Sequence, residues 1–578
     1  MSSGSIEVVS ALDPQLEVAT SLKWGVLRGP ANAIWKEYKS TTLSDTTMDF
    51  NCPPPNSNVY LSPYVMVETE INLVFSCTNT DFTNAGSPNS LVDIGRYDAL
   101  RAFPVSAITQ SANISLNSST ISTNVNSYMA EFMRYRPEMD AERISVQPTM
   151  LDNVQSYKDA KDSLFNPLGD YEQSTPSMPG RGTFKPKSIS AVVRATDTRW
   201  YQTVRYVLTE NMLISPFLYN DKPSTQALFG IQNFGLSLQL EKLSRVWSHM
   251  DIGDRSRQPA LALLATFGEV QIAGAGAVNL GPVQSSRALI SWLTPNITQV
   301  VPRTNMYPYY QHTPYISTCK YSADAVGTTL DYTTQAISLR VVPNRVFIFV
   351  KQRKGDRTFQ DTDSYEFINR CSVNFDALEG IFSSASSSQL YQMSADNGLQ
   401  DTYSAYKDRV GSVLCLSFGS QIALPAGLAP GVSGTFSLSF VLQLTKIANL
   451  PKNNSTTDLD CVIVTETAGI LQLFDDNSII NVGIISSKQV LEAATETISY
   501  DQLSADSAAA VSGGFGIGSL VKKATPVVRA IADAADMVAP FMGEGRKMSG
   551  SAKLGGDLVK SSGGAMLSKA QLKRLAMQ

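Results

Sequence analysis

The sequence predicts an all-β protein that contains two β-sandwiches in series. Short runs of alternating apolar and polar residues recur between residues 51 and 501, and Gly, Pro, Asn and Ser separate them. Helical spacing is rare within this region, which is typical of sandwich and barrel proteins. The chain has 578 residues, of which 43% are hydrophobic, so it is long enough to bury two large cores. The strands are too many for one sandwich, although no internal sequence repeat marks the two halves.

The N-terminal half is expected to hold an arm and the first sandwich. Residues 1–50 are polar and mixed, and we expect an extended arm there. Pro53, Pro54 and Pro55 cannot lie in a central strand, so they predict a turn before the first strand of the sandwich. The first sandwich is predicted over residues 51–260. Its clearest strand is Phe234 to Glu241, where apolar and polar side chains alternate.

An excursion with some helix is predicted inside the first sandwich, over residues 126–186. Tyr128, Phe132 and Tyr135 recur at helical spacing, together with Met129 and Met133. A long polar stretch without periodicity follows. Stretches of this kind are usually functional or pack as excursions between strands.

The second sandwich is predicted over residues 261–501. Phe436 to Thr445 is the cleanest alternating run in the chain, and Ile337 to Val341 alternates in the same way. Val346 to Val350 is continuously apolar and predicts a strand that is buried on both faces.

The C-terminal region has a different composition and charge. Residues 502–519 are rich in Ala, Ser and Gly and predict a flexible linker. Residues 520–578 are predicted to form a basic, amphipathic and partly helical tail with Gly-rich segments. From Phe515 onwards there are ten Lys or Arg and four Asp or Glu, a net charge of +6, against −4 for the whole chain. The body is therefore acidic and the tail basic.

The composition argues against an enzyme and predicts no catalytic, metal or cofactor site. The only two histidines are His249 and His312, and most acid–base and metal chemistry uses histidine. Both are expected to be structural or surface residues. The six cysteines form no C-x-x-C pair and are expected to be reduced core thiols: Cys52, Cys77, Cys319, Cys371, Cys415 and Cys461. A small basic cluster, Lys351, Arg353, Lys354 and Arg357, is expected to be a solvated turn.

Neither a secretory signal nor a transmembrane helix is expected. Met1 to Leu12 contains Ser and Glu where a signal peptide would be apolar, and no run of 18 apolar residues occurs. We therefore expect a protein made in the cytoplasm or nucleus of a host cell and not secreted.

These features resemble the double jelly-roll major capsid proteins of viruses, of the virophage, polinton and adintovirus type. The resemblance rests on the two strand series, on the excursion at 126–186 and on the junction Val511-Ser512-Gly513-Gly514-Phe515. It implies two jelly-roll sandwiches in tandem, homotrimers with a pseudo-hexagonal outline, and an icosahedral virion shell. Penton or minor capsid proteins are then implied as partners.

The junction also resembles the cleavage signals of adenovirus-type cysteine proteases, which cut after Gly-Gly. Gly513, Gly514 and Phe515 would form the maturation site, and a viral protease would be a further partner. The fit is loose, because such proteases favour Met, Ile or Leu where this chain has Val511.

The basic residues of the tail are candidates for contact with a membrane or with the genome. They are Lys522, Lys523, Arg529, Arg546, Lys547, Lys569, Lys573 and Arg574.

Two other functions fit the sequence. The chain could be a single jelly-roll capsid protein of a small RNA or single-stranded DNA virus, with a protruding domain. Such proteins often carry a basic N-terminal arm, whereas residues 1–20 hold Glu7, Asp13 and Glu17 and no Lys or Arg. It could also be a carbohydrate-binding or hydrolytic β protein. The five tryptophans are scattered and form no binding stripe.

Overall fold

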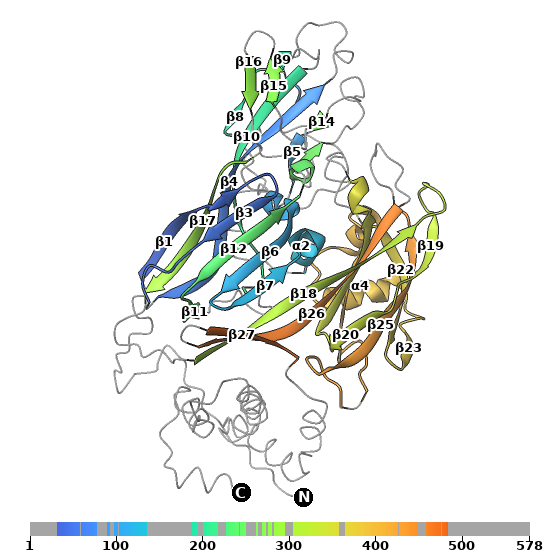
Figure 1. Ribbon diagram of the computed structural model, residues 1–578. Coiled ribbons are helices and arrows are strands. Elements are labelled where there is room, and N and C mark those ends of the chain that lie inside the picture. Colours follow the sequence, from blue (N-terminus) through green and yellow to red (C-terminus); the bar gives the residue numbers. More distant parts are fainter. Residues whose placement is uncertain are drawn as a thin grey trace, which may run out of the picture.

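The computed structural model describes residues 32–483 with internal gaps. The gaps are residues 58, 78–89, 93–97, 102, 136–185, 195–199, 218–226, 242, 250–261, 264–268, 273–275, 280–282, 295–303, 358–364, 426, 448–457 and 475–476. Two β-sandwiches lie side by side in this part of the chain (Figure 1).

The first sandwich has two sheets. One sheet has the order β1-β17-β4-β10, and the other has the order β3-β12-β6-β7, with β2 beside β3. The bounds are β1 (Asn32–Lys39), β2 (Thr42–Leu43), β3 (Thr47–Asn51), β4 (Tyr60–Cys77), β6 (Thr109–Leu116), β7 (Ser119–Thr123), β10 (Trp200–Asn211), β12 (Phe234–Leu240) and β17 (Val283–Thr294).

Short elements surround this sandwich. Strands β8 (Ser188–Ile189) and β9 (Val193–Arg194) pair with β10, whereas β11 (Leu228–Phe229) and β14 (Ala262–Leu263) pair with β4. Two further pairs stand apart, β5 (Asp98–Leu100) with β13 (Trp247–His249) and β15 (Glu269–Ile272) with β16 (Gly276–Asn279). The helical elements are α1 (Pro104–Ile108), α2 (Val125–Met133) and η4 (Leu243–Val246).

The second sandwich repeats this layout. Its sheets have the orders β18-β26-β21-β24 and β19/β20-β25-β22-β23, and β27 pairs with β26. The strand bounds are β18 (Thr304–Lys320), β19 (Thr329–Thr333), β20 (Ile337–Val341), β21 (Arg345–Gln352), β22 (Phe367–Phe375), β23 (Leu378–Ile381), β24 (Val413–Ser417), β25 (Ser433–Thr445), β26 (Asp458–Phe474) and β27 (Asn477–Val482). The helical elements are η6 (Lys354–Asp356), α4 (Ser387–Asp396) and η7 (Ala405–Arg409).

Both sandwiches are jelly rolls of one topology. If β2 and β3 count as one strand, and β19 and β20 as another, each sandwich has eight main strands. In both, the first, eighth, third and sixth strands form one sheet, and the second, seventh, fourth and fifth form the other. This is the strand order of a jelly roll. The predicted tandem jelly rolls are confirmed, and a single jelly roll with a protruding domain is excluded.

The strand pairings move two expected boundaries. Strand β1 falls in the expected arm, yet it pairs with β17 from Asn32↔Thr294 to Lys39↔Arg287. Strand β17 falls in the range expected for the second sandwich, yet it lies between β1 and β4 of the first. The arm therefore ends before β1, and the first sandwich extends to Thr294. Alternation in a sequence identifies a strand but not its partner, and the last strand of a jelly roll returns to pair with the first.

Local sequence explains several elements. Helix α4 begins with a capping box, because Ser386 and Gln389 bond reciprocally to each other's backbone N–H groups. Pro63 is tolerated in the central strand β4 because the β17–β4 register shifts between Ile290 and Trp292, which pair with Val65 and Leu61.

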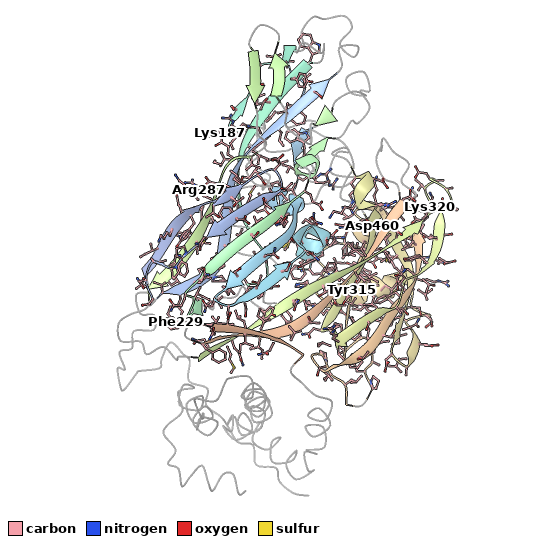
Figure 2. The ribbon with its side chains drawn as sticks, viewed as in Figure 1. Lys187, Phe229, Arg287, Tyr315, Lys320 and Asp460 are labelled. Carbon is pink, nitrogen blue, oxygen red and sulfur yellow. The ribbon has the colours of Figure 1, made fainter. Side chains whose placement is uncertain are left out.

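Two hydrophobic cores fill the molecule, and they share one sheet. In β21, Val346, Ile348 and Val350 belong to the core of the second jelly roll. Phe347 and Phe349 point to the other face and join the core of the first. The continuous apolar run that predicted a strand buried on both faces is therefore confirmed. The charged residues Lys187 and Arg287, in contrast, lie on the side of the first jelly roll away from the second (Figure 2).

Candidate assembly site: the interface between the two jelly rolls

Helix α2 of the first jelly roll lies against the β18-β26-β21-β24 sheet of the second (Figure 1). The predicted helical spacing around Tyr128 and Phe132 is confirmed by this helix. Phe132 and Tyr135 both meet Phe347 edge-on, with ring centroids 5.8 and 5.2 Å apart. Aromatic pairs of this geometry add to the burial of apolar area. The aromatic side of α2 therefore packs on the neighbouring jelly roll.

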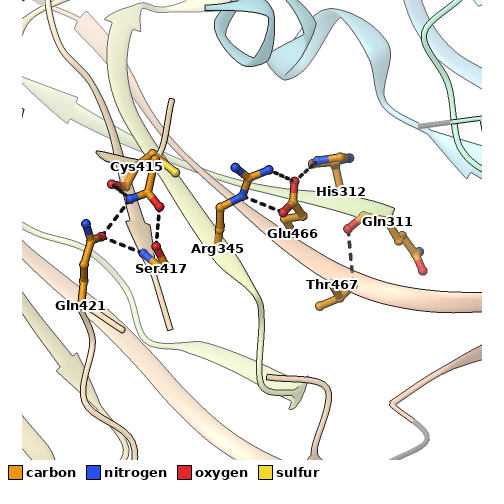
Figure 3. A network of polar contacts seen from close by, with 9 residues as sticks. Gln311, His312, Arg345, Cys415, Ser417, Gln421, Glu466 and Thr467 are labelled. Carbon is orange, nitrogen blue, oxygen red and sulfur yellow. Dashed lines mark hydrogen bonds and ion pairs between the residues drawn. The ribbon is translucent and has the colours of Figure 1, made fainter. Parts of the chain in front are cut away.

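A buried polar triad lies beneath these rings (Figure 3). Arg345 donates to both carboxylate oxygens of Glu466, Nε to Oε1 at 2.8 Å and Nη2 to Oε2 at 2.9 Å. His312 Nε2 lies 3.0 Å from Glu466 Oε2. The His312 ring stacks on Tyr128 at 5.2 Å and meets Phe132 edge-on at 4.6 Å, so α2 covers the triad.

The triad holds Glu466 as a carboxylate. Burial opposes its ionisation, but the hydrogen bond with His312 and the charge and hydrogen bonds of Arg345 outweigh burial. Together they lower the pKa of Glu466 from 4.5 to about 2. A bidentate pair in a low-dielectric site also fixes the planes of both groups. The geometry positions strands β18, β21 and β26 under α2.

A second buried ion pair joins α2 to β21. Lys351 Nζ lies 2.5 Å from Glu131 Oε1 and donates to the carbonyl oxygen of Ser127 at 3.1 Å. Lys354 forms an ion pair with Glu241 of the first jelly roll. The expectation that this basic cluster is a solvated turn is therefore wrong for Lys351, which is buried beside Glu131, whereas Arg353 and Lys354 are exposed as expected. Charge spacing along a sequence does not reveal such partners.

The residues after α2 continue the contact. Arg134 forms an ion pair with Asp401, and its guanidinium lies 5.4 Å from the ring centre of Tyr365. Its Nη2 donates to the carbonyl oxygen of Gly411 at 3.3 Å. The Tyr135 hydroxyl donates to the carbonyl oxygen of Val413. Both side chains thereby connect the end of α2 to the segment from Asp401 to Val413, which leads into β24.

A separate set of hydrogen bonds joins the jelly rolls at another place. Ser118, just before β7, and Ser119, its first residue, exchange four hydrogen bonds with Ser478 of β27. The backbone N–H of Phe229 donates to the hydroxyl of Tyr307 at 2.8 Å. Anchoring at two separated places resists hinge motion between the jelly rolls.

The cysteines carry no bridge in the described residues. Cys52, Cys319, Cys371, Cys415 and Cys461 are free and buried, as predicted for reduced core thiols. Burial raises the pKa of Cys52, Cys319 and Cys371 to about 12, which keeps them protonated and unreactive. The side chain of Cys77 lies outside the described residues.

Two further findings concern the described ranges only. They contain no group of three or more His, Cys, Asp or Glu side chains arranged to hold a metal ion. They also contain no helix with the length and hydropathy needed to span a membrane.

All the tail and junction residues predicted from the sequence lie outside the described residues. These are the cleavage residues Gly513, Gly514 and Phe515 and the eight candidate contact residues among the ten Lys and Arg from Lys522 to Arg574. The sequence analysis did not identify Glu466, Arg345 and Glu131 as interface residues. One signal marks them, because each is a charged residue among apolar residues of a strand or helix.

Comparisons with known proteins agree with this architecture. The family model described as the first domain of the Sputnik virophage major capsid protein matches residues 5–275. The model of the C-terminal domain of major capsid protein V20 matches residues 312–410. Capsid protein V20 of the Sputnik virophage is 26% identical over 528 residues, which are 86% of this chain and 83% of that protein.

The solved structures decide the assignment. The structure of the Sputnik virophage determined by cryo-EM matches with a TM-score of 0.70 and 25% identity, over 87% of this chain and 99% of the matched chain. The chain is homologous to the virophage major capsid proteins.

By this homology the chain has a structural role in a virion shell, as the sequence resemblance implied. The mavirus major capsid protein shares its fold, with a TM-score of 0.64 at 14% identity, over 84% of this chain and 98% of the matched chain.

Proposed function

We propose that the chain forms homotrimers with a pseudo-hexagonal outline, which tile an icosahedral shell. The observation that carries the proposal is the buried interface around Glu466, Arg345 and Glu131, which holds two jelly rolls of one topology in a fixed relation. Three rigid chains then supply six jelly rolls around one axis. Closed rotational symmetry of this kind is the rule for homo-oligomers.

The test is the mass of the purified full chain. Native mass spectrometry and negative-stain microscopy should show trimers with six-sided outlines, or shells built from them. The interface between chains should bury more than about 2,000 Å², as in obligate oligomers. A chain that remains monomeric at high concentration contradicts the proposal.

The proposal assigns the chain to the virion and gives it no enzymatic activity. Penton proteins and minor capsid proteins are the proposed partners of the trimers, because a closed icosahedral shell needs five-fold vertices that trimers alone do not fill. Purified virions, separated by gel electrophoresis and identified by mass spectrometry, should contain this chain as the most abundant protein, together with such partners. The absence of this chain from virions contradicts the assignment.

A second element of the proposal is maturation by a viral protease that cuts after Gly514. It is supported by the Gly513-Gly514 bond in a linker of small residues, which is accessible to a protease. The intact mass of the chain from virions should correspond to a C-terminus at Gly514. A mass that includes residues 515–578 in mature particles contradicts the cut.

A third element is contact of the basic tail with an anionic partner, before or in place of its removal. Lys522, Lys523 and the other basic residues supply the charge, and the apolar side of the same segment suits a membrane surface. The full chain should bind DNA or anionic vesicles in a salt-dependent manner. Replacement of the eight basic residues by Gln should abolish binding, and the two probes distinguish genome from membrane. Equal binding by the Gln variant contradicts this element.

A further inference from the structure

The two jelly rolls place a helix at corresponding positions. Helix α2 lies between the fifth and sixth strands of the first jelly roll and packs against β6, its fourth strand. Helix α4 lies between the fifth and sixth strands of the second and packs against β24, its sixth strand, and β22, its fourth. The two helices are therefore topological equivalents.

Helix α2 covers one particular surface of the second jelly roll. This surface is the outward face of the sheet that contains the first, eighth, third and sixth strands. Residues of and just after α2 contact His312 on the first strand, Phe347 and Lys351 on the third, and Val413 on the sixth. Within one chain, therefore, the helix between the fifth and sixth strands of one jelly roll docks on the outward face of this sheet in the other.

The equivalent sheet face of the first jelly roll is partly exposed. We call it the β1-β4 face, and it is defined by the outward side chains of β1, β17, β4 and β10. Trp35 on β1 is 51% exposed and Val207 on β10 is 39% exposed. Arg287 bridges Glu37 and Glu68 across three strands, at 2.8 and 2.6 Å. Figure 2 places Arg287 on the side away from the second jelly roll.

The two sheet faces differ in chemistry in a way that suits different stages of assembly. The covered face of the second jelly roll carries Phe347 and Val464 together with the charged triad and Lys351, whose partners all lie within the chain, so this face is buried when the chain folds. The β1-β4 face carries an ion-pair ladder and can remain in water until a partner arrives. The outward face of α4 is polar as well, with Gln389, Gln392 and Asp396 exposed. Polar surfaces of this kind are typical of contacts that form between folded partners.

We infer that α4 of one chain docks on the β1-β4 face of a second copy, as α2 docks on the second jelly roll within the chain. Each jelly roll of the trimer then contacts the next one around the ring in the same way, through its helix and the sheet face of its neighbour. Such a contact is head-to-tail and uses two different surfaces of each chain, so it closes only when the ring is complete. The inference rests on the proposed trimer and names the two surfaces that build it.

A matched pair of variants tests the β1-β4 face. Val207 in β10 and Val441 in β25 are the same residue type and are both 39% exposed in strands. Val441 lies on the outward face of the other sheet, and the corresponding face of the first jelly roll, at Gln239 of β12, stays exposed beside the interface. Val207→Glu places a charge in the inferred contact, whereas Val441→Glu places the same charge outside it.

The readout is trimer formation by the full chain, measured by native mass spectrometry over a dilution series. We expect Val207→Glu to raise the concentration needed for half-assembly at least about tenfold, because an unpaired charge is desolvated. Val441→Glu should leave it unchanged, and thermal unfolding of both monomers should match the wild type. Normal trimers with Val207→Glu, or equal loss with both variants, overturn the inference. A fall in monomer stability with Val207→Glu without loss of trimer means that the chain covers this face itself, and it also overturns the inference.

A mixing experiment tests the partner surface. Gln392→Glu on α4 should also prevent trimers. In either variant alone, every contact between chains contains one altered surface. In a mixture, the unchanged α4 of a Val207→Glu chain can dock on the unchanged β1-β4 face of a Gln392→Glu chain, so heterodimers should appear. Their absence overturns the head-to-tail arrangement. If the wild-type chain forms no trimer, the proposed function fails; if it does and these variants behave as wild type, only this inference fails.

Discussion

Lys351 of the second jelly roll and Glu131 of the first form an ion pair at 2.5 Å, and their side chains are only 10% and 4% exposed. The two residues are 220 positions apart in the chain. A buried pair of this kind adds little net stability, because both charges lose their hydration. Its effect is to define how α2 lies on β21, and thereby how one jelly roll lies on the other.

Removal of one partner of this pair should be more harmful than removal of both. Glu131→Ala leaves the Lys351 ammonium buried without its carboxylate, and the free energy of unfolding should fall by about 3–5 kcal/mol. The double variant Glu131→Leu with Lys351→Met should recover most of that loss. Denaturant unfolding measures both values.

The exposed pair between Lys320 and Asp458 provides the control, with an N–O distance of 3.2 Å. Lys320→Met should change the free energy of unfolding by less than about 1 kcal/mol, because solvent screens this pair. Equal losses for Glu131→Ala and Lys320→Met would show that the buried pair has no special role.

Acid should weaken the triad around Glu466. The pKa of Glu466 in the folded chain, about 2, lies below the ordinary value of 4.5, so folding favours the carboxylate. This contribution is complete above pH 4.5, is lost as the pH falls towards 2, and is on the order of 3 kcal/mol. Arg345→Met should raise the pKa of Glu466 and flatten this part of the pH dependence. Unfolding measured between pH 2 and pH 5 checks it, and an unchanged slope in Arg345→Met contradicts it.

Glu210 should have the opposite dependence on pH. Its carboxylate accepts the backbone N–H groups of Val105 and Ser106, at 2.9 and 3.0 Å, at the start of α1. Burial raises its pKa from 4.5 to about 7, although the hydrogen bonds with Ser106 and Val105 oppose the rise. A raised pKa means that folding favours the protonated acid, so its contribution is complete below pH 4.5 and is lost as the pH rises through 7.

We therefore expect the free energy of unfolding to fall by about 3 kcal/mol between pH 4.5 and pH 7.5 through Glu210 alone. Glu210→Gln keeps an acceptor for the helix but does not titrate, so the variant should lose this fall. Glu466 remains ionised throughout the interval and does not contribute to it. A variant with the same pH profile as the wild type would refute the role of Glu210.

Gly411 should be irreplaceable at the edge of the interface. Its φ is +94°, and a Cβ there would lie 1.9 Å from the carbonyl oxygen of Tyr365. Gly327 has a similar φ of +85° but open space around it. Both Ala variants therefore carry the strain of the left-handed region, about 1–2 kcal/mol, and only Gly411→Ala adds a backbone clash. Soluble yield and thermal unfolding should fall sharply for Gly411→Ala and slightly for Gly327→Ala; similar behaviour of the two would contradict the clash.

The sequence predicted strands better than it predicted their partners. The alternation from Phe436 to Thr445 lies within β25, and the apolar run from Val346 to Val350 lies within β21. Strand β17 was assigned to the wrong sandwich, because a jelly roll pairs its first and last strands across the whole domain. Non-local pairing of this kind leaves no mark in a local pattern.

The strand β18 was missed for a different reason. Pro308 and Pro314 interrupt its sequence and normally argue against a strand. Both prolines are accommodated because β26 is the partner of β18 on one side, and β18 ends the order of its sheet. The interface residues were missed because their partners lie in the other jelly roll. The sequence alone marks Glu466 and Glu131 as unusual but cannot say what neutralises them.

The two prolines of β18 also have a consequence for the edge of its sheet. They are six positions apart, so the amide hydrogens that they lack fall on the same side of the strand. A long edge strand with unpaired backbone N–H and C=O groups would otherwise pair with strands of other chains and promote fibre formation. The gaps in this row of donors make such growth unfavourable and leave side-chain recognition as the route by which copies associate.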